Sequence, residues 1–225
     1  MTADSILQLP AHRGPIYLLR HGETLWNRAR RLQGRLNSDL TPLGEAQARA
    51  MGHCLRPLLQ REARTPRFLV SPLDRTRRTA ALVAEAAGLD LALAEYEPRL
   101  QELSFGQWEG LAYGEIARLS PELWAARQAD RWRQAPPDGE SYAVAARRLA
   151  GWFADIAEEE RPLVVVAHGG VGRLLRGLYS KLAPQEIPDL DVPQDALFRF
   201  FDGQLERHQT DIRQPVSRGP ETLPA

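Results

Sequence analysis

Four short apolar runs stand out in the pattern of hydrophobic and polar positions along the chain. They cover residues 16–19, 68–70, 91–94 and 163–167, and each is followed by polar or turn-forming residues. A strand buried on both faces of a sheet shows a continuous apolar run of this kind rather than strict alternation. We therefore expect strands in these four places, the run at 163–167 being the clearest.

Segments with helical spacing separate these strands. Thr41-Pro42 is typical of a helix start, since Thr can cap and Pro is tolerated at the first helical position. Gly88 is typical of a helix end, and Ser141 precedes an amphipathic stretch with apolar residues every three to four positions. The expected helices run from 42 to about 59, from 71 to 87, from 141 to about 156, and from 170 to 178.

The remaining segments complete the expected fold. Residues 196–201 and 204–207 suggest a terminal hairpin around Asp202-Gly203. Strands that alternate with helices predict a single α/β domain, with a mostly parallel sheet of about six strands and helices on both faces. We expect that domain to span residues 15–210, with a helical lid insert at about 103–140. Residues 1–14 would form an N-terminal arm and residues 211–225 a disordered tail.

Composition narrows the classes of function. The 225 residues contain 29 Lys and Arg and 29 Asp and Glu, so the net charge is zero. A neutral chain has no overall field to attract nucleic acid or an anionic membrane, and we expect neither as a partner. The single cysteine, Cys54, cannot form an internal disulfide or a cysteine metal cage. With no signal peptide and no apolar run long enough to span a bilayer, we expect a cytoplasmic protein.

Polar residues that can take part in catalysis or ligand binding follow three of the expected strands. Arg20-His21-Gly22 follows the first strand, Ser71-Pro72-Leu73-Asp74-Arg75 the second, and His168-Gly169-Gly170 the last. Ligands of open α/β sheets bind beyond the carboxyl ends of the strands. Two histidines and two arginines can therefore converge on one edge of the sheet.

This set of groups suits a phosphate. Arginine offers forked donors that match phosphate oxygens, and the Gly169 amide lies near a helix start, where an anion is favoured. A neutral imidazole is a nucleophile, with an unperturbed pKa of roughly 6.5. Phosphoryl transfer mainly requires positioning and charge stabilisation. No clustered carboxylates or His-x-x-x-His spacing indicates a metal site, and we expect neither a metal nor another cofactor.

The segment Leu19-Arg20-His21-Gly22-Glu23-Thr24-Leu25-Trp26-Asn27 closely resembles the signature of the histidine phosphatase superfamily, also called phosphoglycerate mutase-like. The resemblance extends in order through Gln33-Gly34, residues 40–44, 71–75 and 102–110, to His168-Gly169-Gly170. It covers residues 15 to about 207. One departure is Arg78, where relatives often have Gln.

The resemblance implies specific roles. His21 would carry the phosphoryl group, and Glu102 would protonate the leaving alcohol and then activate water. Arg20, Arg75 and His168 would complete the phosphate pocket. The other expected ligand-binding residues are Asn27, Gln33, Gly34 and Gly169. The substrate would be a small phosphorylated metabolite, and the family includes monomers, dimers and tetramers, so a homodimer remains open.

Some assignments have competitors. Glu23 and Glu109 also lie near motifs; Glu23 could orient Arg20 or Arg75, and Glu109 could be structural. The arginines of the expected lid could form a solvated face, or one or two of them could reach a second anionic group of the substrate. These are Arg118, Arg127, Arg131 and Arg133.

Three other functions compete with a phosphatase of this superfamily. A phosphoglycerate mutase would return the phosphoryl group to substrate, but the insert reads more like that of the phosphatase branch. A dinucleotide-binding module would use the strand and glycines of residues 164–172, although the full G-x-G-x-x-G pattern is absent. An inactive relative would only bind phosphorylated ligands.

Overall fold

One six-stranded sheet organises the part of the chain that the computed structural model describes, residues 12–212. Its order is β3-β2-β4-β1-β5-β6. The pairs β1–β4, β2–β4 and β2–β3 are parallel, whereas β1–β5 and β5–β6 are antiparallel. The strands are β1 (Ile16–Arg20), β2 (Arg67–Val70), β3 (Ala94–Tyr96), β4 (Leu163–Ala167), β5 (Ala196–Phe201) and β6 (Gln204–Gln209).

The central strands are buried because alternate side chains enter two different cores. In β1, Leu18 belongs to one hydrophobic cluster and Leu19 to another. In β4, Val165 and Val166 divide in the same way, and every residue of this strand is buried. Covering on both faces explains why these strands are apolar without alternation.

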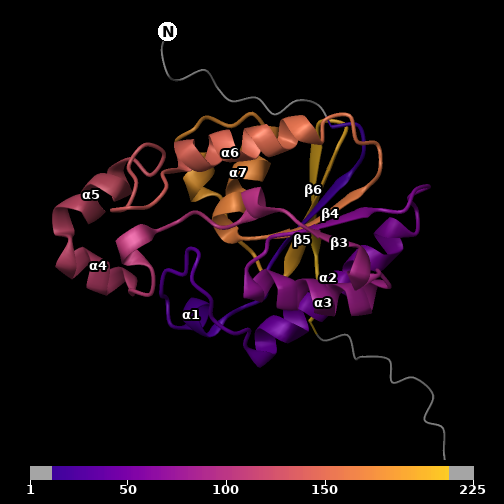
Figure 1. The fold of residues 1–225 in the computed structure, drawn as a ribbon, viewed down its shortest axis with the longest axis horizontal. Helices are drawn as coiled ribbons and strands as arrows, with labels where there is room; N and C mark the ends of the chain where they lie inside the picture. Colours follow the sequence, from indigo (N-terminus) through magenta and orange to yellow (C-terminus); the bar gives the residue numbers. More distant parts are fainter. Residues whose placement is uncertain (1–11, 213–225) are drawn as a thin grey trace, which may run out of the picture.

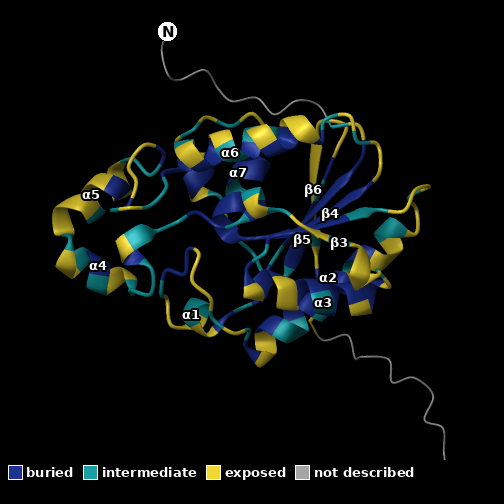
Figure 2. Cartoon of the chain, viewed as in Figure 1, coloured by how far each residue is buried: buried dark blue, intermediate teal, exposed yellow. Residues whose placement is uncertain are grey.

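Helices supply those two covers (Figure 1). The pair α2 (Pro42–Leu59) and α3 (Asp74–Ala87) packs together on one face, and α6 (Tyr142–Asp155) and α7 (Gly169–Tyr179) pack on the other. Figure 2 shows buried surfaces facing the sheet and exposed surfaces facing outward on these helices. The structure is thus a single α/β domain with a mostly parallel sheet, as the sequence predicts.

The segment expected to form a lid is helical and lies to one side of the sheet (Figure 1). It contains α4 (Tyr113–Leu119), α5 (Pro121–Ala129) and a 3₁₀ turn at Gly106–Trp108. Trp108 and Ile116 form a small hydrophobic cluster of their own with Leu32. Further 3₁₀ turns occur at Leu91–Leu93, Pro98–Leu100 and Ile187–Asp189.

Two expected boundaries are wrong, the first because of a local hydrogen bond and the second because of a contact between strands. Residues 91–93 form a 3₁₀ turn because the Asp90 carboxylate accepts a hydrogen bond from the Ala92 amide at 2.9 Å, and the strand starts only at Ala94. Helix α3 starts at Asp74 rather than Ser71. The Ser71 amide instead donates to the carbonyl of Val166 at 3.0 Å, which extends the β2–β4 pairing by one residue.

The sequence analysis missed the short helix α1 (Leu25–Arg28). Thr24 and Asn27 form a reciprocal capping box there, since each side chain accepts from the other's backbone N–H. The expected hairpin is present, and Asp202 and Gly203 both take positive φ angles, 48° and 73°.

Most of the expected arm and tail, residues 1–11 and 213–225, lies outside the described residues. Within residues 12–212, no helix combines the length and apolar character needed to cross a bilayer.

Candidate functional site

His21 stands at the carboxyl end of β1, next to the centre of the sheet. Its amide donates to the Ala167 carbonyl of β4 at 3.0 Å, and its side chain is buried. Ring atom Nδ1 lies 2.8 Å from the Gly22 carbonyl oxygen. A carbonyl only accepts, so Nδ1 carries the proton and Nε2 keeps the free lone pair. The backbone thereby selects the tautomer in which Nε2 can act as a nucleophile.

His168 follows β4 and lies beside His21. The two ring centroids are 5.3 Å apart. His168 Nε2 lies 2.7 Å from the hydroxyl oxygen of Ser71, at the end of β2, and Nδ1 is buried with no hydrogen-bond partner within residues 12–212. A buried ring nitrogen without a partner is costly unless a ligand satisfies it.

Two arginines flank the histidines. Arg75, in the first turn of α3, donates to the carbonyl of Gly34 at 2.6 Å and to that of Leu36 at 2.7 Å. Arg20, the last residue of β1, donates to the Val192 carbonyl. Each keeps a buried Nε that has no partner in the described part of the chain. Loop carbonyls thus hold both guanidinium groups while leaving donors available.

Burial and positive charge set the ionisation of these groups. Burial, with Arg75 and Arg20 as further causes, lowers the pKa of His21 well below 6.5. Burial and Arg75 act in the same direction on the pKa of His168. Burial lowers the pKa of Arg20 and of Arg75 to about 10, against the opposing charge of Glu102. At neutral pH the site therefore holds two neutral imidazoles between two charged guanidinium groups.

Glu102 is held by the start of α7. Its carboxylate accepts from the backbone amides of Gly170 at 3.0 Å and Val171 at 3.3 Å. It also accepts from the Leu103 amide at 3.0 Å. These contacts place an acidic side chain in the same cavity as His21.

The structure brings the nine expected site residues together. A cavity of about 160 Å³ is lined by eight of them, and the ring of the ninth, His168, lies beside the ring of His21. Asn27 accepts from the Thr24 amide at 3.2 Å, and Gln33 donates to the Thr24 hydroxyl. The eight lining residues are Arg20, His21, Asn27, Gln33, Gly34, Arg75, Glu102 and Gly169.

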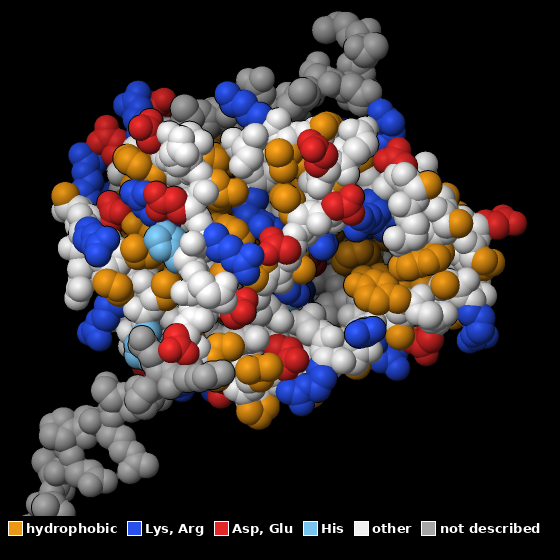
Figure 3. Space-filling view, turned by 180° about the vertical axis from the view of Figure 1, so that it is seen from behind, with side chains coloured by type: hydrophobic (Ala, Val, Ile, Leu, Met, Phe, Trp, Pro, Cys, Tyr) orange, Lys and Arg blue, Asp and Glu red, His pale blue; other side chains and the backbone are white. Residues whose placement is uncertain are grey.

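The cavity also contains residues that sequence analysis did not single out. Figure 3 shows a hollow with Lys or Arg side chains at its floor and hydrophobic side chains along the wall nearest the helical insert. Arg173 lies four residues after Gly169 on α7, so helical spacing from the His168 motif could have pointed to it. The further lining residues include Arg31, Phe105, Tyr113, Tyr142 and Arg173.

The competing acids have other partners. Glu23 accepts from the Thr41 hydroxyl at 2.6 Å and from Arg28 at 3.0 Å, so the idea that it orients Arg20 or Arg75 is wrong. Glu109 accepts from the amides of Arg35 and Phe105 at 3.1 and 2.9 Å. Glu109 thus connects the segments that contain Arg35 and Phe105, and it does not line the cavity.

The additional arginines considered from the sequence also lie elsewhere. Arg78 is exposed and pairs with Glu45 at 2.7 Å. Arg131 pairs with Asp189, and Arg127 is buried with its guanidinium 5.6 Å from the Phe105 ring centroid. Within residues 12–212, none of the four insert arginines lines the cavity.

No three His, Cys, Asp or Glu side chains in the described part of the chain form a group that could hold a metal ion. The arrangement instead offers a neutral nucleophile, several anion donors and one acid. These are the groups needed to bind and transfer a phosphoryl group.

Comparison with known proteins agrees with this chemistry. A family model described as the histidine phosphatase superfamily (branch 1) matches residues 16–204. The "Probable phosphoglycerate mutase GpmB" of Erwinia tasmaniensis is 38% identical over 158 residues, which cover 68% of this chain and 69% of that protein.

Two solved structures share the fold. Mycobacterial glucosyl-3-phosphoglycerate phosphatase, in complex with VO3, is 28% identical with a TM-score of 0.71, covering 87% of this chain and 96% of that one. The α-ribazole phosphatase of Shigella flexneri is 23% identical with a TM-score of 0.74, covering 91% and 100%.

Proposed function

The chain belongs to the histidine phosphatase superfamily, branch 1, and on this premise we propose that it is a metal-independent phosphatase acting on a small phosphate monoester through a phosphohistidine at His21. The observation that carries the proposal is the hydrogen bond, 2.8 Å long, from His21 Nδ1 to the Gly22 carbonyl. The charged side chains of Arg20 and Arg75 lie close to the same ring. The hydrogen bond leaves Nε2 unprotonated in the position where Arg20 and Arg75 gather phosphate oxygens.

The reaction proceeds in two transfers. In the first, the Nε2 lone pair forms a bond to phosphorus while the bond from phosphorus to the ester oxygen breaks, and Glu102, which enters this step as the neutral carboxylic acid, gives that oxygen its proton. In the second, Glu102 takes a proton from water, the water oxygen bonds to phosphorus, and the bond from phosphorus to Nε2 breaks. Inorganic phosphate leaves, and His21 and Glu102 return to their starting states.

Arg20, Arg75 and His168 stabilise the phosphoryl group in both transfers. The two guanidinium groups neutralise charge on the non-bridging oxygens. His168 Nδ1 donates to one of them, and Ser71 supports that tautomer by donating its hydroxyl proton to Nε2. The Gly169 amide, at the start of α7, adds a further donor.

The rest of the cavity favours a substrate with a second anionic group. Arg173 donates to the Leu190 carbonyl at 2.5 Å and lies 3.4 Å from the Tyr142 hydroxyl, and no carboxylate of residues 12–212 forms an ion pair with it. Arg31, by contrast, pairs with Glu115 at 3.1 Å. A carboxylate or second phosphate on the leaving group would match the charge of Arg173.

A phosphoglycerate mutase is the second candidate, supported by the printed name of the Erwinia relative. It would use the same first transfer and return the phosphoryl group to a bound acid instead of water. Hydrolysis is favoured by the likeness to the mycobacterial phosphatase and by the insert arginines, which lie outside the cavity and so would not hold an intermediate for return transfer.

The test is phosphate release from p-nitrophenyl phosphate and from a panel of sugar and glycerate phosphates in excess EDTA, with His21→Ala as the comparison. We expect wild type to turn over with chelator present and the variant to be inactive. Activity that EDTA abolishes, or equal activity in His21→Ala, would overturn the proposal. Interconversion of 2- and 3-phosphoglycerate faster than phosphate release would identify a mutase.

A further inference from the structure

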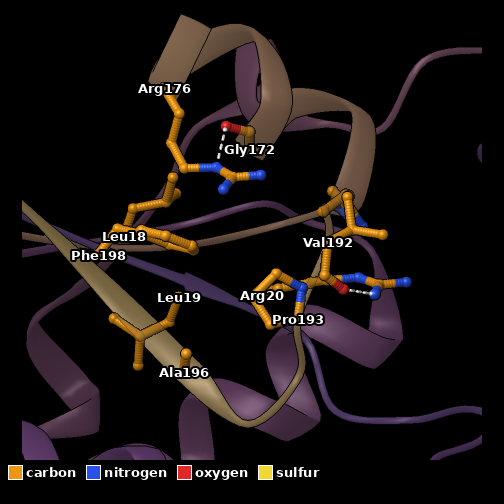
Figure 4. Close-up of a pocket in the computed structure, with 11 residues that line it drawn as sticks. Leu18, Leu19, Arg20, Gly172, Arg176, Val192, Pro193, Ala196 and Phe198 are labelled. Carbon is orange, nitrogen blue, oxygen red and sulfur yellow. Dashed lines mark hydrogen bonds between the residues drawn. The ribbon is translucent and has the colours of Figure 1, made fainter. Parts of the chain in front are cut away.

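The segment between the last 3₁₀ turn and β5, residues 190–194, contacts the site from outside the family motifs. The Leu190 carbonyl accepts from Arg173, and the Val192 carbonyl accepts from Arg20. Figure 4 shows Val192 and Pro193 lying against the Arg20 side chain. Gln194, the last residue of the segment, also contacts the site, because its side-chain amide nitrogen donates to groups of His21 and Asn27.

Ion pairs anchor this segment at Asp191. Its carboxylate binds Arg176 of α7 and Arg207 of β6, each at 2.8 Å. Arg176 is buried and lies 4.2 Å from the Phe198 ring centroid. Because the buried Arg176 contacts both the Asp191 carboxylate and the Phe198 ring, it fixes the position of the segment relative to α7.

The cavity drawn in Figure 4 does not form a second site. It is lined by Arg20 and His168 among others and has a volume of only about 20 Å³. A space of that size holds no more than a water molecule. The interest of this region is therefore its contact with the catalytic groups.

Gln194 makes two contacts with those groups. Its Nε2 donates to the His21 carbonyl and to Asn27 Oδ1, both at 3.1 Å. Asn27 Oδ1 also accepts from the Thr24 amide at 3.2 Å. Two donors therefore face the oxygen of the Asn27 amide, and rotating that amide by 180° would bring its NH2 group against both of them.

The orientation of Asn27 matters because the residue lines the phosphate cavity. With Oδ1 held by Thr24 and Gln194, the NH2 group is left to donate to an anion. In the opposite orientation the amide oxygen would face the phosphate and repel it. A hydrogen bond to a charged group contributes about 1.5–3 kcal/mol, so the orientation affects affinity by at least about tenfold.

We propose that Gln194 is a positioning residue that holds the Asn27 amide with its NH2 group toward the phosphate. It acts through Asn27 and has no contact with the substrate. The inference rests on the proposed function only in taking the cavity as a phosphate site, and a binding measurement tests it without turnover.

The test is calorimetric titration with inorganic phosphate of wild type, Gln194→Met, Asn27→Ala and the double variant. Met is close to Gln in size and has no donor. We expect Gln194→Met to raise the dissociation constant about tenfold in the wild-type background, and much less in the Asn27→Ala background. An unchanged constant, or an equal rise in both backgrounds, would overturn the inference.

Gln209→Met is the matched control. Gln209 is exposed on β6, and its Nε2 donates at 2.7 Å to the carbonyl of Asp195, the residue after Gln194. We expect this variant to bind phosphate like wild type, and a comparable loss would show a general effect of loosening the loop, against the proposal.

A second substitution guards against loss of packing at this position. Gln194→Glu keeps the size of the side chain but presents oxygens to the Asn27 and His21 oxygens. We expect phosphate binding at least as weak as in Gln194→Met; binding like that of wild type would overturn the inference.

The proposed function can fail separately. If wild type binds phosphate but hydrolyses no ester, the phosphatase proposal falls while the role of Gln194 is still decided by these titrations.

Discussion

The carboxylate of Glu102 accepts a hydrogen bond from the backbone N–H of Gly170 at 3.0 Å. This contact joins the residue expected to act as acid to the first turn of the helix that follows His168. Acid and second histidine therefore share one rigid support, although 66 positions separate them along the chain.

The proposed role of Glu102 predicts a dependence on the leaving group. We expect Glu102→Gln to lower kcat by about 10²- to 10⁴-fold for an alkyl phosphate, because general acid catalysis contributes about that much. The loss should be smaller for the first transfer from p-nitrophenyl phosphate, whose leaving phenolate needs less protonation. Rapid-quench measurement of the first turnover with both substrates tests this. Equal losses in the first transfer would count against Glu102 as the acid.

Gly170 should tolerate no side chain. A Cβ there would lie 2.7 Å from Glu102 Oε1 and 2.8 Å from a Leu103 methyl carbon. We expect Gly170→Ala to displace the carboxylate and lower kcat at least tenfold. Gly151 is the control because it lies within α6 and a Cβ there meets no atom within 4 Å.

The control has an expected result of its own. Gly151→Ala should leave kcat unchanged and raise the unfolding free energy by about 0.5–1 kcal/mol, since Ala favours a helix over Gly. Chemical denaturation and steady-state kinetics on both variants check the pair. Equal kcat values in Gly170→Ala and Gly151→Ala would show that the contact between Glu102 and Gly170 does not matter for turnover.

The buried histidines should make the fold sensitive to acid. The pKa of His21 and of His168 is lowered by burial in the folded protein, whereas the unfolded value is near 6.5. Below pH 6.5 the unfolded chain binds more protons than the folded one, so stability falls as pH falls. Each histidine can change the unfolding equilibrium constant by up to tenfold per pH unit there.

Urea unfolding at pH 7.5, 6.5 and 5.5 measures this effect. We expect the pH dependence between 6.5 and 5.5 to be weaker in His21→Gln, which has no ionisable group at this position. An identical slope in wild type and variant would mean that His21 is not held neutral in the fold.

Arg173 should distinguish between substrates. We expect Arg173→Met to raise KM for a phosphate ester with a carboxylate by about tenfold more than KM for p-nitrophenyl phosphate, as one charge-assisted hydrogen bond is lost. The ratio of the two KM changes separates this effect from any shift of the Leu190 carbonyl that Arg173 also holds.

Arg131→Met is the comparison for that experiment. Arg131 pairs with Asp189 on the surface, outside the cavity. We expect it to leave both KM values unchanged. If KM for the carboxylated ester rises selectively in Arg131→Met and not in Arg173→Met, the second anionic group binds at the helical insert instead.

The sequence by itself determined the strands and the chemistry at their ends. Residues 163–167 are apolar throughout because both faces of β4 are covered, so the strand could be found without the structure. Arg20-His21 and His168-Gly169 directly follow strands, and a parallel sheet brings such ends to one edge. The helix end at Leu59 followed from the spacing of apolar residues, and the next helix end followed from the capping preference of Gly88.

Only the tertiary structure decided which other residues reach that edge. Ser71 lies outside the expected helix because its amide donates to the Val166 carbonyl and its hydroxyl contacts the ring of His168. Gln194 reaches His21 across 173 positions. No periodicity or motif spacing records contacts of that range, because they depend on how loops between packed elements meet in space.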